Sequence, residues 1–232
     1  MSSGTMKYNL KKIFGIICYI LSLCLVIYYF ILEFSVLNVT SPINRLKILL
    51  LIILIMYCGS KFINNKKLYK LNFYIWFLLY IVMLLNLTLF DKYFGREGVS
   101  LYLIDLDYIK NYFEYSFNII PFSTIDNYLL ALRNGNLALG DFIYNIFGNI
   151  LAFCPFALFL PRIFKKTEKW YYYFLVVSLV ILFIEIMQLL MLTGSFDIDD
   201  YILNIFGSMV LYFILNIKFI KRFLDKILCL GN

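Results

Sequence analysis

The sequence contains no histidine, and only 15% of its 232 residues are charged. Histidine is the commonest general base and metal ligand, so its absence excludes a Ser-His-Asp triad and an HExxH zinc site. Any chemistry would therefore depend on carboxylates, amides, lysines or hydroxyl groups. Five cysteines are present without CxxC spacing, and we interpret them as reduced packing residues rather than as disulfides or metal ligands.

Hydrophobic residues, in contrast, make up 63% of the chain and aromatic residues 20%. Soluble domains have about 25% charged residues, so this composition predicts an integral membrane protein and excludes a large soluble catalytic domain. A crossing takes roughly 20 residues. Six apolar runs qualify: 13–32, 46–63, 71–90, 142–160, 170–192 and 201–217. We expect an all-α polytopic membrane bundle of about six transmembrane helices.

Basic and acidic residues separate between the two sides of these predicted spans. With the N-terminus in the cytoplasm, 15 of the 21 lysines and arginines lie on that side and 11 of the 14 acidic residues on the other. Cytoplasmic loops carry an excess of lysine and arginine. We therefore expect a multi-pass protein of the bacterial cell membrane with both termini in the cytoplasm. The net charge of +7 then reflects topology, and we do not expect a nucleic-acid partner.

The long segment 91–140 between the third and fourth spans should contain structure of its own. Apolar residues recur at helical spacing over 109–120, which predicts an amphipathic helix at the outer interface that ends before Pro121. Ser123 and Asp126 have the spacing of a capping box, which predicts a second short helix. The segment either covers a site or packs at the interface.

An octapeptide occurs almost unchanged twice, as DFIYNIFG at 141–148 and as DYILNIFG at 200–207. In each copy an aspartate, an asparagine and a glycine fall on nearly the same helix face. They are Asp141, Asn145, Gly148, Asp200, Asn204 and Gly207. In one interpretation the asparagines and glycines hold spans together while the aspartates cap helix N-termini. In the other, the polar side chains contribute to a site.

Glu185 lies well inside a predicted span, with Gln188 one turn further on the same face. A charge in the hydrocarbon region costs several kcal/mol unless it is paired or protonated, so such a residue is by default a functional candidate. The alternative is a protonated Glu185 that is hydrogen-bonded to Asn145 or Asn149.

Three aspartates, Asp197, Asp199 and Asp200, crowd the loop before the sixth span. They could bind a divalent cation through oxygen ligands, or form a solvated turn in which Asp200 is an N-cap. The catalytic candidates are thus Glu185, Asp199 and Asp200. The candidates for ligand binding are Asn145, Asn149, Glu185, Gln188, Asp197 and Asn204.

Four stretches resemble, in order and spacing, the signature segments of the VanZ-like family. They are NIIPFSTI from Asn118, NIFGNILAFCPFALFLP from Asn145, EIMQ from Glu185 and GSFDIDDYILNIFGSMVLYF from Gly194. The resemblance implies a VanZ-like domain over 71–217, with a two-span region at 1–70 before it and a basic cytoplasmic tail at 218–232. Many members of the family have an arginine at the position of Gly194, so this chain lacks that cation.

The founding member of the family is associated with resistance to the glycopeptide antibiotic teicoplanin, and the resemblance implies no established reaction. We therefore expect an envelope factor that lowers sensitivity to teicoplanin-like lipoglycopeptides through an outward-facing polar site. Its partner would be a membrane lipid or a lipid-linked cell-wall precursor. Two alternatives remain open: a membrane enzyme that acts on such a lipid through carboxylates, and a carrier coupled to protons through Glu185. No cofactor is expected apart from the cation considered above.

Overall fold

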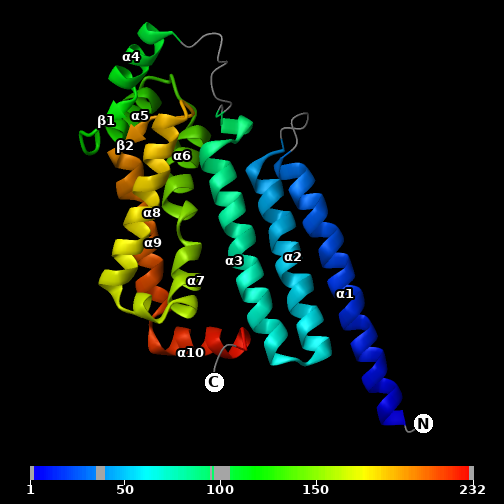
Figure 1. Ribbon diagram of the computed structural model, residues 1–232. Helices are drawn as coiled ribbons and strands as arrows, with labels where there is room; N and C mark the ends of the chain where they lie inside the picture. The colour runs from blue at the N-terminus through cyan, green and yellow to red at the C-terminus, as the bar shows by residue number, and fades with distance from the viewer. Residues whose placement is uncertain (1–2, 35–39, 95, 97–104, 230–232) are drawn as a thin grey trace. The chain divides into compact units, whose positions relative to one another are not determined.

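The computed structural model describes residues 3–34, 40–94, 96 and 105–229, and it is mostly helical (Figure 1). The remaining residues, including 95 and 97–104 of the long segment, lie outside the described part. The elements are α1 (Ser3–Glu33), α2 (Pro42–Ile63), α3 (Lys66–Leu89), η1 (Lys92–Phe94), α4 (Leu106–Tyr115), β1 (Phe117–Asn118), α5 (Ser123–Arg133), α6 (Leu139–Ala152), α7 (Pro155–Ile163), η3 (Lys165–Glu168), α8 (Trp170–Leu190), β2 (Phe196–Asp197), α9 (Ile198–Leu215) and α10 (Lys218–Ile227).

Six helical segments among the described residues are long and apolar enough to cross a membrane, which confirms the predicted fold class. They are α1, α2, α3, the pair α6 and α7, α8, and α9. A continuous helix satisfies all its interior backbone groups without water, so apolar runs of this length are stable in lipid as helices. Short helices α4 and α5 lie between the third and fourth spans, as expected.

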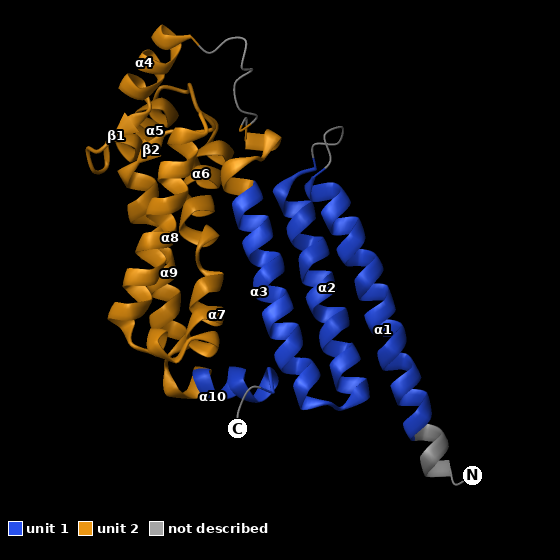
Figure 2. Cartoon of the chain, viewed as in Figure 1, with its two compact units in different colours: residues 1–86, 221–232 blue, residues 87–220 orange. Residues whose placement is uncertain are grey.

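The chain divides into two compact units (Figure 2). The first consists of residues 1–86 and 221–232, and the second of residues 87–220. In the first unit α1 and α2 pack closely at Gly59. A Cβ added to this glycine would lie only 3.0 Å from Cε2 of Tyr19.

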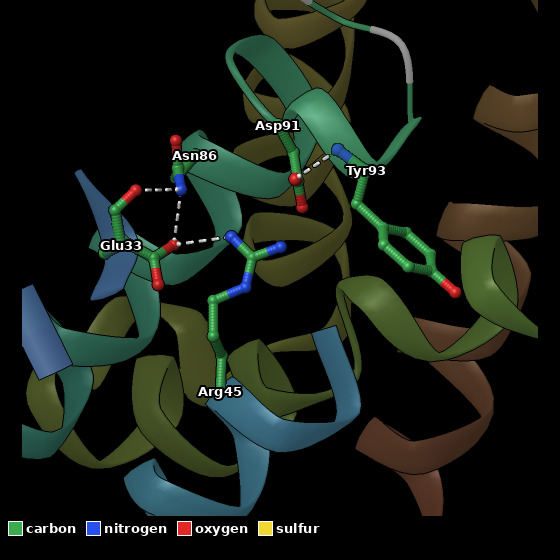
Figure 3. A network of polar contacts seen from close by, with 5 residues as sticks. All are labelled: Glu33, Arg45, Asn86, Asp91 and Tyr93. Carbon is green, nitrogen blue, oxygen red and sulfur yellow. Dashed lines mark hydrogen bonds and ion pairs between the residues drawn. The ribbon is translucent and has the colours of Figure 1, made fainter. Parts of the chain in front are cut away.

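Two buried polar networks tie α3 to the other helices of this unit. In one, Asn72 donates to Ser60 Oγ at 2.7 Å and to the carbonyl of Met56 at 2.9 Å. In the other, Asn86 donates to Glu33 Oε1 at 2.8 Å, and the same oxygen lies 3.5 Å from Nη1 of Arg45 (Figure 3). Hydrogen bonds of this kind hold helices together where the hydrophobic effect supplies no driving force. No pattern in the sequence predicts either network.

In the second unit α9 is the central helix. It packs against α8 and also against α6 and α7. The helix of the fourth span is interrupted where α6 ends at Ala152 and α7 begins at Pro155. Proline has no N–H to donate to the preceding turn. At this point the N–H of Cys154 donates to the carbonyl of Leu151, and the N–H of Ala157 donates to the carbonyl of Cys154.

The segment before α6 differs from its prediction in two respects. The amphipathic helix α4 ends at Tyr115, because the chain extends as β1 at Phe117–Asn118, so the predicted helix over 109–120 is too long. The predicted capping box is wrong: Phe122, with φ 68°, precedes the first residue of α5, and Ser123 Oγ donates to Asn118 Oδ1 at 2.9 Å. The cap of α5 comes from a distant aspartate, described below.

Candidate functional site

A short parallel strand pair joins the segment between α4 and α5 to the loop before α9, at one end of the second unit. Phe117 of β1 pairs with Phe196 of β2, and their rings stack with centroids 4.9 Å apart. The hydroxyl of Tyr112 on α4 donates to the carbonyl of Gly194. These contacts place the loop that precedes α5 directly beside the aspartates that begin α9.

Asp199 is the cap of α5. Its carboxylate accepts hydrogen bonds from the backbone N–H groups of Phe122, of Thr124 at 2.9 Å and of Ile125 at 3.2 Å. The first N–H groups of a helix have no partner within the helix, and they favour a negative charge. Asp199 is only 1% exposed, and this role in holding α5 explains why a buried carboxylate is tolerated there.

Asp197 is also occupied by neighbouring protein groups. Its side chain accepts from the hydroxyl of Thr124 at 2.6 Å, from Asn118 Nδ2 at 3.2 Å and from the N–H of Asp199 at 2.9 Å. It is the N-cap of α9, so the alternative in which Asp200 takes that role is wrong. Asp197 and Asp199 therefore belong to a hydrogen-bond network that fixes the loop. Because protein groups donate to their carboxylate oxygens, we assign both residues a structural role.

The other polar candidates lie on α6, α8 and α9. Glu185 is 3% exposed, and its Oε2 accepts from the N–H of Asp197 at 3.3 Å, which differs from the Asn145 or Asn149 partner considered above. Gln188 is also buried, and Asn149 donates to Oδ1 of Asp200. We call Asn149, Glu185, Gln188, Asp200 and Arg96 the polar cluster.

Arg96 is the member of the cluster that sequence reasoning missed. After α3, Asp91 accepts from the N–H of Tyr93 at 2.9 Å, and its carbonyl accepts from the N–H of Arg96 at 3.1 Å, so the chain turns back on itself (Figure 3). The guanidinium then donates to the carbonyl of Thr88, which also accepts from Gln188 Nε2 at 2.9 Å. The turn thus directs this cation toward α8.

The charged groups near Arg96 include the two carboxylates of the polar cluster, Asp200 and Glu185. Burial lowers the pKa of the Arg96 guanidinium from its ordinary value, whereas the nearby carboxylates of Asp200 and Glu185 act to raise that pKa. Among the described residues no carboxylate is close enough to form an ion pair with it. Its Nη1 lies 3.2 Å from the position that a Cβ on Gly194 would occupy. Gly194 therefore leaves room for the guanidinium of Arg96, which a side chain at position 194 would crowd.

Tyr128 of α5 completes the surroundings of the cluster. Burial, together with the charges of Asp200 and Asp197, raises the pKa of the Tyr128 phenol above its ordinary value. The phenol therefore stays protonated at neutral pH and can only be a neutral hydrogen-bonding group. Tyr128 was not among the candidates from the sequence, because nothing in its neighbours along the chain indicates that α5 lies against α9.

The two octapeptides prove to be different in their surroundings. Gly207 packs against α6, where an added Cβ would overlap the carbonyl of Ile150, so its predicted packing role is confirmed. At Gly148, no described residue lies within 4 Å of the position that a Cβ would occupy, so its predicted packing role is wrong. Asn145 makes a local bond, with Nδ2 donating to the carbonyl of Asp141 at 2.9 Å. Asp141 lies in the first turn of α6 and is not its N-cap, which is Ala138.

Asn204, in contrast, is buried on the face of α9 that carries both Asp200 and Gly207. No group in the described part of the chain donates to its Oδ1. An unpaired buried acceptor costs about 1–3 kcal/mol, so this position next to the polar cluster is unfavourable unless something donates to it.

A divalent-cation site has no preformed ligand set in this arrangement. Over the residues that the structure covers, no three acidic or cysteine side chains come together as a group that could hold a metal ion. The oxygens of Asp197 and Asp199 accept hydrogen bonds from protein groups instead. The arrangement does offer two carboxylates, one guanidinium and several amides at one end of a membrane bundle.

The fold and the cluster define a multi-span helical membrane protein with ionisable groups buried near the end of its spans. The family model for VanZ/LLP1 matches residues 77–220, which include the strand pair and every member of the polar cluster. The chain belongs to this family. No curated protein and no solved structure matches it.

Proposed function

We propose that this protein lowers bacterial sensitivity to teicoplanin-like lipoglycopeptides, and that the polar cluster is the site through which it does so. The observation that carries the proposal is the burial of Glu185, with the half-buried Asp200 nearby, beside the guanidinium of Arg96. Two carboxylates near one another in a medium of low dielectric are unfavourable unless a proton or a cation offsets one of them. A structural role alone does not account for that cost.

The chemistry of the cluster supports a ligand that carries charges of both signs. The Arg96 guanidinium suits a phosphate oxygen, because charge-assisted bonds from arginine to phosphate are strong. Glu185 and Asp200 suit an amine or hydroxyl groups, and the unpaired Oδ1 of Asn204 is a further acceptor. Membrane lipids and lipid-linked cell-wall precursors combine these groups. With the orientation expected from the basic loops, the cluster would face the outer leaflet, where lipoglycopeptides act.

The test is the inhibitory concentration of teicoplanin and of vancomycin for a susceptible Gram-positive host that expresses the protein. We expect a larger increase for teicoplanin, because a change at the outer leaflet should matter most to the drug that carries an acyl chain. Glu185→Gln and Asp200→Asn should abolish the increase at unchanged membrane levels of protein. Asp126→Asn is the matched control, since it removes one exposed carboxylate from the same end of the unit.

Two results would contradict the proposal. Wild-type protein that is present in the membrane and raises neither concentration, or both equally, would remove the resistance role. A fully functional Glu185→Gln variant would remove the polar cluster as its site. The second result leaves the first part of the proposal standing, so the two parts are tested separately.

An enzymatic function is favoured by the same pair of carboxylates. If Glu185 and Asp200 share one proton, one can act as a general acid while the other acts as a general base. Purified protein incubated with a lipid-linked precursor, with Mg²⁺ or with EDTA, would then release product, and Glu185→Gln would stop that release. Binding of the precursor without turnover would favour the non-enzymatic role.

A further inference from the structure

The helix after the last span, α10, has an exposed apolar surface that the polar cluster does not involve. Phe219, Phe223 and Ile227 are 77%, 55% and 39% exposed. They are spaced by four residues, so they form one stripe along the helix. Aromatic side chains that are exposed to this extent in a row are unusual on a surface in contact with water.

A stripe of cations runs beside the aromatic one. Lys218, Arg222 and Lys226 are exposed and are likewise spaced by four residues, and each precedes an apolar residue of the first stripe. The opposite side of the helix faces protein, because Ile220 and Leu224 are partly buried. Near the C-terminal end of α10, Tyr57 donates to the carbonyl of Ile227 at 3.3 Å. The two exposed stripes are therefore the side of α10 that no described element covers.

The end of α9 locates this helix at a membrane surface. Tyr212 on the last turn of α9 donates to the carbonyl of Glu168 at 2.6 Å, which joins it to the basic loop at η3. α9 ends at Leu215, and α10 begins at Lys218, only two residues later. A helix that begins within two residues of the end of a span starts at the depth of the lipid headgroups.

We propose that α10 lies in the plane of the membrane surface, inserts Phe219 and Phe223 below the headgroups, and binds anionic phospholipids through Lys218, Arg222 and Lys226. Apolar and cationic stripes side by side are the pattern by which interfacial helices bind anionic lipid. Lysine and arginine bury their aliphatic stems while the charged ends remain at headgroup level. This inference does not depend on the proposed function, because it involves the opposite end of α9.

The first experiment measures the lipid preference of the full chain without altering its cysteines. Protein in vesicles of phosphatidylcholine receives a trace of spin-labelled phosphatidylglycerol or spin-labelled phosphatidylcholine, and the spectrum gives the relative association of each. One cation near an anionic surface changes binding by about five-fold. Averaged over all lipid sites around the protein, the triple variant Lys218→Gln, Arg222→Gln, Lys226→Gln should lower the preference for phosphatidylglycerol by at least about two-fold.

The matched control removes three cations outside α10: Lys92→Gln, Lys110→Gln and Arg133→Gln. It changes the net charge by the same amount and should leave the preference almost unchanged. An equal loss of preference in both triple variants would mean that only the total charge matters, and it would overturn the role of α10. An unchanged preference in the α10 variant would overturn it as well.

The second experiment measures depth and stays informative even if the triple variant folds poorly. Single cysteines at Phe219, Arg222 and Phe223, in a background without the five native cysteines, carry a spin label whose collisions with oxygen and with a water-soluble nickel chelate are compared. Labels at Phe219 and Phe223 should collide mainly with oxygen, and the label at Arg222 mainly with the chelate. Labels at Phe219 and Phe223 that collide mainly with the chelate, or with neither reagent, would place the aromatic stripe in water or against protein and refute the proposal.

Discussion

The role of Asp199 as the cap of α5 gives a prediction that separates structure from function among the three clustered aspartates. Its Oδ1 accepts from the N–H of Phe122, and its Oδ2 accepts from the N–H groups of Thr124 and Ile125. In Asp199→Asn one of these oxygens becomes an NH₂ group, which faces N–H groups and cannot accept. The variant therefore loses at least one of the three bonds, together with the negative charge at the helix N-terminus.

The expected cost follows from these contacts. A hydrogen bond to a charged group contributes about 1.5–3 kcal/mol, and an N–H left without a partner in a buried site adds its desolvation cost. We expect α5 to be destabilised by about 3 kcal/mol, which corresponds to a loss of about a hundred-fold in protection from hydrogen exchange when the helix opens locally. The spans themselves should stay folded, since none of the three N–H groups belongs to a span.

Hydrogen exchange followed by mass spectrometry on detergent-purified protein measures this directly. Peptides that cover the first turn of α5 should exchange much faster in Asp199→Asn, whereas peptides from α8 should not change. Asp200→Asn is the control, because the carboxylate of Asp200 accepts from Asn149 and an amide oxygen can do the same. Normal protection of α5 in Asp199→Asn would refute the capping role. An equal loss of α5 protection in Asp200→Asn would show that the negative charge of the loop, and not the hydrogen bonds of Asp199, stabilises α5.

Three further predictions concern the packing and topology of the spans. Gly207→Ala should lower the melting temperature by several degrees and Gly148→Ala should not, since only the first Cβ would overlap the backbone of α6; equal melting temperatures would contradict this. Asn86→Leu removes both hydrogen bonds from Nδ2 to Glu33 and should destabilise the first unit by about 1–3 kcal/mol in thermal melts monitored by circular dichroism. In a cysteine-free background, a cysteine at Asn134 should react with an impermeant maleimide on intact cells, and one at Lys166 only after permeabilisation; the reverse pattern would invert the expected orientation.

The sequence was sufficient to predict the six spans and the family, because hydropathy over about 20 residues is a local property and the signature stretches are continuous. It also placed Glu185 and Gln188 within the fifth span, and the structure buries both side chains among protein groups. The octapeptides show that nearly identical local sequence does not determine which glycine packs against another helix. Gly148 and Gly207 have similar neighbours along the chain, but α6 lies against Gly207, whereas no described residue lies against Gly148.

Only the tertiary structure decided the roles of the polar residues. Asp199 and the loop that it caps are more than 70 residues apart in the chain, so no local pattern could reveal that Ser123 would not cap α5. Arg96 looked like one of several basic residues beyond the third span, and a backbone turn at Asp91 brings its guanidinium to the cluster. The sequence alone determined which segments enter the membrane, because transfer free energies add along each segment. Which side chains meet depends on how the segments pack against one another. That packing is not a property of any single segment, and it is set only when the helices assemble.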